Sequence, residues 1–172
     1  MAVVGHVAVP GDKSISHRAV LIGSIAEGET RVTGFGRSGD TQATVDGMRA
    51  LGVEIEWLAE DELVVHGVGL RGLRAGAVDC ANSGTLMRLV SGICAGQDGE
   101  FTLTGDESLS ARPMERIADP LRRLGAGQLA VAPGSRLRRP RENRVTPAGA
   151  CAMGASADTL RSGGTPHRGF VR

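Results

Sequence analysis

Aromatic side chains and net charge are both scarce in this chain of 172 residues. Phe, Trp and Tyr make up 2% of the sequence and Tyr is absent, which argues against a base-stacking surface for single-stranded nucleic acid. A formal net charge of +1 favours neither a nucleic-acid nor a membrane partner. Apolar runs such as residues 19–22 fall far short of the roughly 18 residues of a membrane span. Residues 1–9 also lack the pattern of a signal peptide.

Cysteine is equally sparse. Cys80, Cys94 and Cys151 form neither a metal-spaced pair nor an even set for disulfides. We therefore expect reduced thiols, a cytoplasmic protein and no metal site. The hydrophobic fraction of 41% and the charged fraction of 23% are typical of globular proteins. With this length, they predict one domain or at most two.

The composition changes near residue 126. Residues 1–126 carry 17 acidic and 12 basic side chains, whereas residues 127–172 carry eight arginines against Glu142 and Asp158. Four of the seven prolines also lie in the second stretch, where only residues 128–132 have a strand-like pattern. Three interpretations of 127–172 stay open: a disordered basic arm that binds nucleic acid, a poorly structured extension of the fold, or out-of-frame translation of GC-rich DNA.

Residues 1–126 contain an internal repeat. Three landmarks recur in the same order at offsets of 70, 71 and 73 residues: Arg18 and Arg88, Gly34 and Gly105, Gly52 and Gly125. Each copy predicts an apolar helix, a strand and a second helix, placed after Ser14 or Ser83, at 28–34 or 99–105, and at 41–52 or 113–125. The first copy adds alternating strands at 53–57 and 62–66, and a leading strand is possible at 3–9. We therefore expect repeat units at 13–80 and 81–126, the second losing its last strands at the composition change.

The first copy opens on a cluster suited to an anion. Ser14 is a good N-cap for the helix that follows, Lys13 lies at its start, and Arg18 lies one turn further on. A helix N-terminus offers free N–H groups and a partial positive charge. The plainer alternative is a capped surface helix with scattered cations. A nucleotide phosphate loop is not supported, because the glycine spacing does not fit.

The second copy repeats this arrangement. Asn82 or Ser83 can cap its helix, Gly84 allows a ligand to approach the backbone, and Arg88 lies about one turn further on. Arg112 directly precedes a proline that suits the first position of another helix. Each feature alone has a plain alternative, an ordinary cap or a solvated loop cation. Together with the first copy they suggest two helix N-termini that face one anionic ligand.

Three motifs resemble the 5-enolpyruvylshikimate-3-phosphate (EPSP) synthases: residues 10–19, 82–88 and 106–126. The resemblance covers residues 1–126 but not 127–172. It implies an α/β fold of repeated βαβαββ units of the enolpyruvyl transferase type, an alpha-beta prism, with the lobe incomplete. It also implies transfer of the enolpyruvyl group of phosphoenolpyruvate to the 5-hydroxyl of shikimate 3-phosphate. Phosphate would be released through a tetrahedral intermediate, without metal or cofactor, in aromatic amino acid biosynthesis.

The resemblance implies substrate-binding roles for five residues of this chain. Lys13 resembles the lysine that touches both substrates. Ser14 and Arg18 resemble contacts to shikimate 3-phosphate, and Gly84 and Arg112 resemble contacts to the phosphate of phosphoenolpyruvate. Residues that would shape the second site are Asn82, Thr85 and Arg88.

Parts of the family pattern have no counterpart in this chain. The acidic residues for proton transfer belong to a second lobe in that family, and its Ser-x-Gln type segment has only a poor substitute at 155–158. We therefore expect no catalytic residue here, and a truncated, frameshifted synthase that is inactive alone. Exposed apolar helix faces would leave it marginally stable or associating, whereas full-length family members resemble monomers. The alternatives are a non-catalytic anion-binding module and a nucleic-acid binder acting through 127–172.

Overall fold

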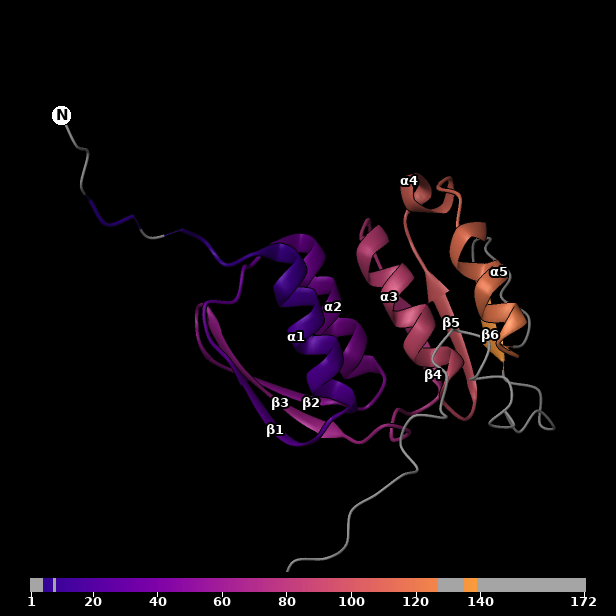
Figure 1. The fold of residues 1–172 in the computed structure, drawn as a ribbon, viewed down its shortest axis with the longest axis horizontal. Helices are drawn as coiled ribbons and strands as arrows, with labels where there is room; N and C mark the ends of the chain where they lie inside the picture. Colours follow the sequence, from indigo (N-terminus) through magenta and orange to yellow (C-terminus); the bar gives the residue numbers. More distant parts are fainter. Residues whose placement is uncertain (1–4, 8, 127–134, 139–172) are drawn as a thin grey trace, which may run out of the picture.

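The computed structural model describes residues 5–7, 9–126 and 135–138, the last four as backbone only. Within this part, two three-stranded sheets and five helices form an α/β structure (Figure 1). This is the fold class that the sequence predicts. None of the helices in the described ranges is both long and apolar enough to cross a membrane.

The first sheet comes from residues 27–68. Its strands are β1 (Glu27–Val32), β2 (Glu54–Ala59) and β3 (Glu62–Val68), in the order β1-β3-β2 with both pairs antiparallel. Helices α1 (Lys13–Ile25) and α2 (Gly39–Ala50) complete this half of the molecule. All five elements lie where the sequence predicts them. Residues 5–7 and 9 form no strand, whereas the rest of the leading strand considered at 3–9 lies outside the described residues.

The second sheet has the order β4-β5-β6. β4 (Gly76–Asp79) runs parallel to β5 (Glu100–Thr104), which pairs antiparallel with β6 (Ser135–Arg138). Helix α3 (Gly84–Ala95) connects β4 to β5, and α4 (Glu107–Ser110) and α5 (Glu115–Arg123) follow.

The predictions for this half are confirmed for α3, β5 and α5, whereas β4, α4 and β6 were not predicted. β6 lies in the stretch 127–172, where the only predicted strand, 128–132, is outside the described residues. The segment 155–158 and Cys151 are also outside them.

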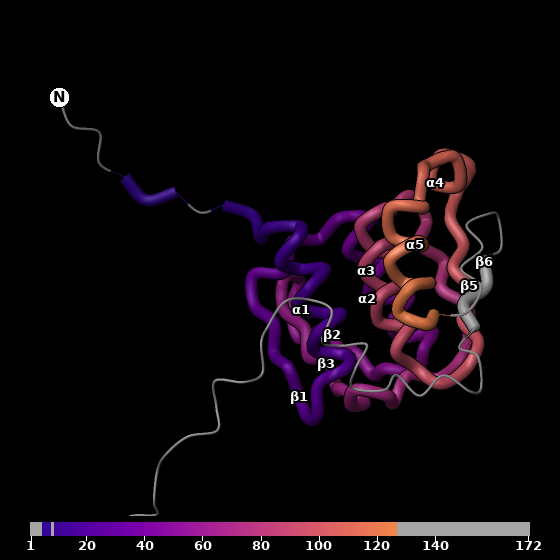
Figure 2. The backbone as a smooth tube through the Cα atoms, turned by 45° about the vertical axis from the view of Figure 1, so that its right-hand side comes forward, coloured from indigo at the N-terminus to yellow at the C-terminus, as the bar shows by residue number. Residues whose placement is uncertain are grey.

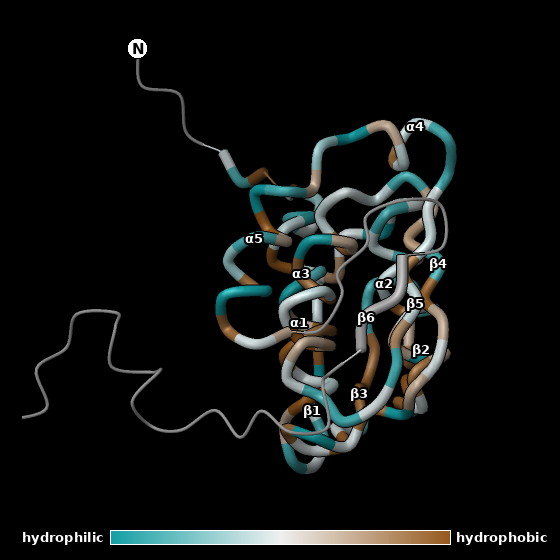
Figure 3. Tube along the Cα trace, turned by 90° about the vertical axis from the view of Figure 1, so that its right-hand side faces the viewer, coloured by the Kyte–Doolittle hydropathy of each residue, from teal (hydrophilic) through white to brown (hydrophobic). Residues whose placement is uncertain are grey.

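Three helices form the centre of the molecule. α1, α2 and α3 contact one another, and the two sheets flank them on different sides (Figures 1 and 2). Each of these helices buries part of its side chains and exposes the others, and Figure 3 shows that hydrophobic and hydrophilic residues alternate along the chain. The side chains that are fully or almost fully buried between the layers include Val20, Leu21, Val45, Met48, Leu63, Val65, Val78, Leu86, Val90 and Phe101.

Among the residues that the structure describes, one face of α1 is exposed. Ile15 and Ile22, two turns apart on this helix, are 62% and 61% exposed. The apolar exposure expected from the sequence is therefore present here, and the marginal stability inferred from it stays a prediction.

The N-termini of the central helices lie at one end of the molecule. In Figure 1, α1, α2 and α3 all begin at the upper end and descend toward the opposite end. A contact between Lys13 and Asp40 joins the first turns of α1 and α2 directly. Because each N-terminus carries unpaired N–H groups and a partial positive charge, this end of the fold is suited to an anion.

Candidate functional site

Helix α1 is capped by Asp12. Its Oδ1 accepts the N–H of Ile15 at 2.7 Å. The prediction that Ser14 is the N-cap is therefore wrong, because the helix begins at Lys13 and Asp12, an equally good capping residue, lies directly before it. Ser14 lies in the first turn and Arg18 one turn further on, both exposed.

Lys13 is held by the neighbouring helix. Its Nζ contacts the carboxylate of Asp40, which lies in the first turn of α2. The position of Asp40 is favourable for a negative charge, because it lies at a helix N-terminus. The Lys13 side chain is 52% exposed, so an incoming anion can reach its ammonium and compete with Asp40 for it.

Close backbone contacts fix the start of α1. A Cβ on Gly11 would lie 1.9 Å from the carbonyl oxygen of Gly34, and one on Gly36 would lie 2.3 Å from the carbonyl oxygen of Gly11. Ser16 Oγ donates to the Asp12 carbonyl at 2.8 Å and accepts the Gly36 N–H at 2.9 Å. Only glycine permits this approach, and it holds Lys13 beside α2.

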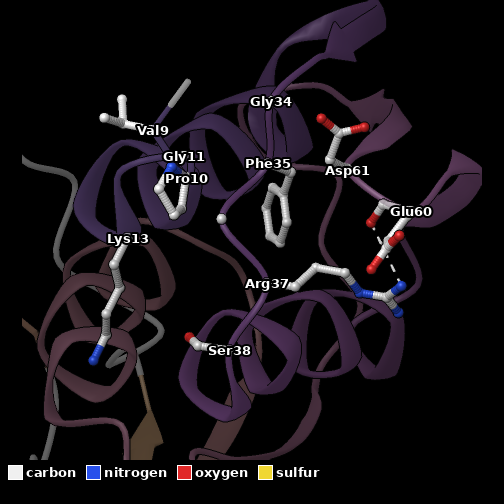
Figure 4. Close-up of a pocket in the computed structure, with 11 residues that line it drawn as sticks. Val9, Pro10, Gly11, Lys13, Gly34, Phe35, Arg37, Ser38, Glu60 and Asp61 are labelled. Atoms are coloured by element: carbon white, nitrogen blue, oxygen red, sulfur yellow. Dashed lines mark hydrogen bonds between the residues drawn. The ribbon is translucent and has the colours of Figure 1, made fainter. Parts of the chain in front are cut away.

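An open pocket of about 670 Å³ lies beside Lys13 (Figure 4). Its other walls are the loop around Phe35 and the turn between β2 and β3, which includes Asp61. Arg37 in this loop lies 4.3 Å above the ring of Trp57 and donates to the Glu60 carbonyl at 3.4 Å. Lys13 contributes to this pocket, and its ammonium points away from Phe35 and Arg37 (Figure 4).

A buried histidine lies one turn into α1. His17 is fully buried, and its Nδ1 is 2.6 Å from Thr44 Oγ1, which donates to the Asp40 carbonyl at 3.3 Å. His17 Nδ1 is therefore the donor, and Nε2 has no partner among the described residues. Burial and the charge of Lys13 lower the pKa of His17. The sequence analysis gave this residue no role of its own, although it lies inside the first motif.

The start of α3 brings two arginines together. Of the two predicted caps, Ser83 is the N-cap, and it accepts the Leu86 N–H at 3.2 Å. Gly84 follows as the first helical residue. A Cβ there would lie 3.1 Å from Arg112 Nη1 and 3.3 Å from Arg88 Nη1. Both guanidinium groups thus lie against the backbone of Gly84, and Thr85 is half-buried beside it.

Asn82 connects this cluster to Asp106. Its Oδ1 accepts from Arg112 Nη2 at 2.6 Å, and its Nδ2 donates to Asp106 Oδ2 at 2.6 Å. Hydrogen bonds from the Asn82 side chain and the Leu109 N–H lower the pKa of Asp106. Asp40 and Asp106 were not predicted as site residues, and Asp106 lies at the start of the third motif.

The two clusters share one end of the fold. Gly84, Asn82, Arg88 and Arg112 form one cluster, whereas Lys13 and Asp40 form the other. Helices α1 and α2 both contact α3, and all three helices begin at the same end of the fold (Figure 1). Among the residues that the structure describes, no three His, Cys, Asp or Glu side chains are grouped so as to hold a metal ion.

Comparison with known proteins identifies the family. The family model described as EPSP synthase (3-phosphoshikimate 1-carboxyvinyltransferase) matches residues 1–129. The chain belongs to the EPSP synthase family. The match ends close to the composition change at residue 126 and contains all three motifs on which the resemblance was based.

Curated EPSP synthases match this chain over a limited part of their own length. The 3-phosphoshikimate 1-carboxyvinyltransferase of Methylococcus capsulatus is 52% identical over 145 residues, which is 78% of this chain and 33% of the relative. That of Alkalilimnicola ehrlichii is 53% identical over 138 residues, 77% of this chain and 31% of the relative. The chain thus spans about a third of the length of these relatives.

The fold agrees with this assignment. An EPSP synthase structure from Acinetobacter baumannii superimposes with a TM-score of 0.74 at 48% identity, covering 78% of this chain and 32% of that one. A second structure of the enzyme from the same organism gives a TM-score of 0.72. The expected enolpyruvyl transferase type of α/β fold is therefore confirmed.

Proposed function

We propose that this chain binds shikimate 3-phosphate and phosphoenolpyruvate as the N-terminal part of an EPSP synthase. Lys13 contacts both substrates, Ser14 and Arg18 bind shikimate 3-phosphate, and Gly84 and Arg112 bind the phosphate of phosphoenolpyruvate. The observation that carries the proposal is the position of two guanidinium groups against the first residue of α3, 3.1 and 3.3 Å from a Cβ at Gly84. We further propose repeat units at 13–80 and 81–126, a cytoplasmic location, and a monomeric state for full-length members of the family.

The chemistry of the reaction explains this arrangement. Enolpyruvyl transfer adds a hydroxyl to phosphoenolpyruvate and then eliminates phosphate, so both substrates and the intermediate carry several negative charges. Cations and N–H groups fixed in advance stabilise such charges, because they need no reorganisation during the reaction. Asn82, Thr85 and Arg88 support the second binding position, where Asn82 already holds Arg112 by a 2.6 Å hydrogen bond.

None of the three acidic residues near these helix starts is assigned a proton-transfer role. Asp12 caps α1 through the Ile15 N–H, Asp40 contacts Lys13, and Asp106 accepts from Asn82 and from the Leu109 N–H. Each carboxylate is thus engaged in holding the structure. We therefore propose that this chain binds the substrates without turning them over. The comparisons give no support to the nucleic-acid or the separate anion-binding module as alternatives.

Calorimetric titration of the full chain with each substrate tests the proposal. Arg112→Ala removes one charge-assisted hydrogen bond to the phosphate, worth about 1.5–3 kcal/mol, and so weakens phosphoenolpyruvate binding roughly tenfold or more. Arg18→Ala weakens shikimate 3-phosphate binding instead. Arg116→Ala, at an exposed position on α5, is the matched control and leaves both affinities unchanged.

Two results would contradict the proposal. Equal phosphoenolpyruvate affinities of the Arg112→Ala and Arg116→Ala variants would remove the assigned binding position. Steady formation of product by the purified chain, supplied with both substrates, would refute binding without turnover.

A further inference from the structure

Asp106, Asn82 and Arg112 form a continuous line of hydrogen bonds beside α3. Asp106 Oδ2 accepts from Asn82 Nδ2, and Asn82 Oδ1 accepts from Arg112 Nη2, both at 2.6 Å. The three residues come from different segments: Asp106 from the end of the loop after β5, Asn82 from the turn before α3, and Arg112 from the loop before α5. This order suggests that Asp106 determines the position of the Arg112 side chain.

Both oxygens of Asp106 are engaged. Oδ1 accepts the Leu109 N–H at 2.7 Å as the N-cap of α4, and Oδ2 accepts from Asn82. An ionised carboxylate can only accept hydrogen bonds. The hydrogen bonds that lower the pKa of Asp106 keep it ionised at neutral pH. The Asn82 side chain must therefore direct its NH₂ group toward Asp106.

The orientation of Asn82 then determines what Arg112 meets. With NH₂ toward Asp106, the amide oxygen faces Arg112, which can only donate. A flipped amide would place acceptor against acceptor at Asp106 and donor against donor at Arg112. Held through Nη2, Arg112 keeps its Nη1 over Gly84, where a Cβ would be 3.1 Å away.

We propose that Asp106 is a positioning residue, which fixes the Asn82 amide so that its oxygen holds Arg112 over the start of α3. The consequence for anion binding rests on the function proposed above, whereas the effect on Arg112 does not. The Arg112 side chain is then already in position when an anion arrives, so it loses less conformational freedom on binding.

For the change in anion affinity when Asp106 is neutralised, the proposal predicts the opposite sign from simple electrostatics. Asp106 is negative and lies near Arg112, so removing its charge should strengthen anion binding if charge alone mattered. If Asp106 acts by positioning, its removal weakens binding, because Arg112 loses its fixed partner.

Asp106→Asn separates the two cases. The variant keeps the shape of the side chain and a good helix cap. When its remaining oxygen accepts the Leu109 N–H, its NH₂ replaces Oδ2 and faces Asn82. The Asn82 amide must then reverse, so that its oxygen accepts from this NH₂ group. The matched rescue is the exchanged pair Asn82→Asp with Asp106→Asn. Asp at 82 accepts from the new amide and from Arg112, which restores every hydrogen bond with an unchanged total charge.

The primary measurement is the side-chain ¹⁵N–¹H spectrum of Arg112 in the full chain, assigned with Arg112→Lys. We expect slowly exchanging guanidinium protons in the wild type, their loss in Asp106→Asn and their return in the exchanged pair. Inorganic phosphate and phosphoenolpyruvate are then titrated, and Asp106→Asn should bind both about three- to tenfold more weakly. Asp12→Asn is the control for the cap. Asp12 caps α1 in the same way but has no hydrogen bond to Asn82, so its thermal unfolding shows how much stability the change from aspartate to asparagine costs at a helix cap.

Either of two outcomes overturns the inference: Asp106→Asn keeps the protected Arg112 signal, or it binds phosphate as tightly as the wild type or more tightly. A wild type that binds neither anion contradicts the proposed function, whereas the Arg112 spectra still test the positioning role. If Asp106→Asn does not fold, acid titration of the wild type replaces it. The Arg112 signal should then disappear as Asp106 is protonated, at a pH below the ordinary carboxyl range, and its persistence through that titration refutes the proposal.

Discussion

Gly84→Ala tests the candidate anion site through one added methyl group. Gly84 is buried at the first position of α3, and the new Cβ would meet Arg112 Nη1 at 3.1 Å, Arg88 Nη1 at 3.3 Å and Leu109 Cδ1 at 3.6 Å. The two closest neighbours are the ends of flexible side chains. A shift of a few tenths of an ångström relieves both contacts, so the folded chain accommodates the methyl group.

The stability of the variant should therefore be maintained or increased. Replacing glycine by alanine in a compatible backbone conformation stabilises a protein by about 0.4–1 kcal/mol, mainly because the unfolded chain loses freedom. The displaced guanidinium groups are half-exposed or exposed, which keeps the cost of moving them small. We expect an unfolding free energy within about 1 kcal/mol of the wild type.

Anion binding should respond much more strongly. The methyl group occupies the space between two guanidinium groups and the first N–H groups of α3, where a phosphate would lie. Loss of a single charge-assisted hydrogen bond, about 1.5–3 kcal/mol, corresponds to a roughly ten- to hundredfold weaker affinity. The variant thus separates binding from stability.

Phosphoenolpyruvate titration and urea unfolding of the same preparations provide the test. Gly92→Ala is the control, because Gly92 lies in the same helix and its added Cβ meets nothing within 4 Å. It should gain up to about 1 kcal/mol in stability and bind phosphoenolpyruvate like the wild type. Equal affinities of Gly84→Ala and Gly92→Ala would refute the placement of the anion at Gly84.

Three further predictions concern the interior. Burial and Lys13 lower the pKa of His17, with Arg18 acting in the same direction and Asp40 against it. The unfolded state, whose His17 has a pKa of about 6.5, then binds a proton first, so stability in urea should fall as the pH drops below 6.5 and level off below the folded pKa. This fall should be smaller in His17→Gln. Burial raises the pKa of Cys80 and Cys94 to about 12, so in a Cys151→Ser chain a thiol reagent at pH 8 should modify them only after unfolding, and rapid native modification contradicts this. Leu86→Ala at a fully buried position should cost about 2–5 kcal/mol in urea unfolding, and a cost no larger than that of Leu89→Ala, at 38% exposure, would be inconsistent with the packing.

The long elements could be predicted from sequence because their patterns are local. The apolar period of α1 and α2 and the alternation of β2 and β3 are properties of the segments themselves. β4 has four residues and α4 has four, which is too short for any period to show. β6 depends on its partner, since its pairing with β5 joins segments more than 30 residues apart.

The sequence predicted which residues lie at the candidate site better than it predicted how they contact one another. The motif that includes Lys13 and the one that includes Gly84 pointed to helix N-termini, and both residues lie at the first helical position. The cap at Asp12 was missed because two good capping residues lie two positions apart and sequence alone does not choose between them. The contacts of Asp40 with Lys13, and of Asp106 with Asn82, span 27 and 24 residues and arise only from tertiary packing.

The two helix starts differ in how much positive charge they leave for a ligand. At α1 an aspartate caps the helix and a second aspartate contacts Lys13, so both the helix dipole and the ammonium are already compensated. At α3 the cap is the neutral Ser83, and two guanidinium groups lie against the next residue. The dipole of α3 therefore remains available to a small dianion, whereas a ligand at α1 must displace Asp40 from Lys13. This difference supports the proposed placement of the phosphate of phosphoenolpyruvate at Gly84, which the resemblance also implies.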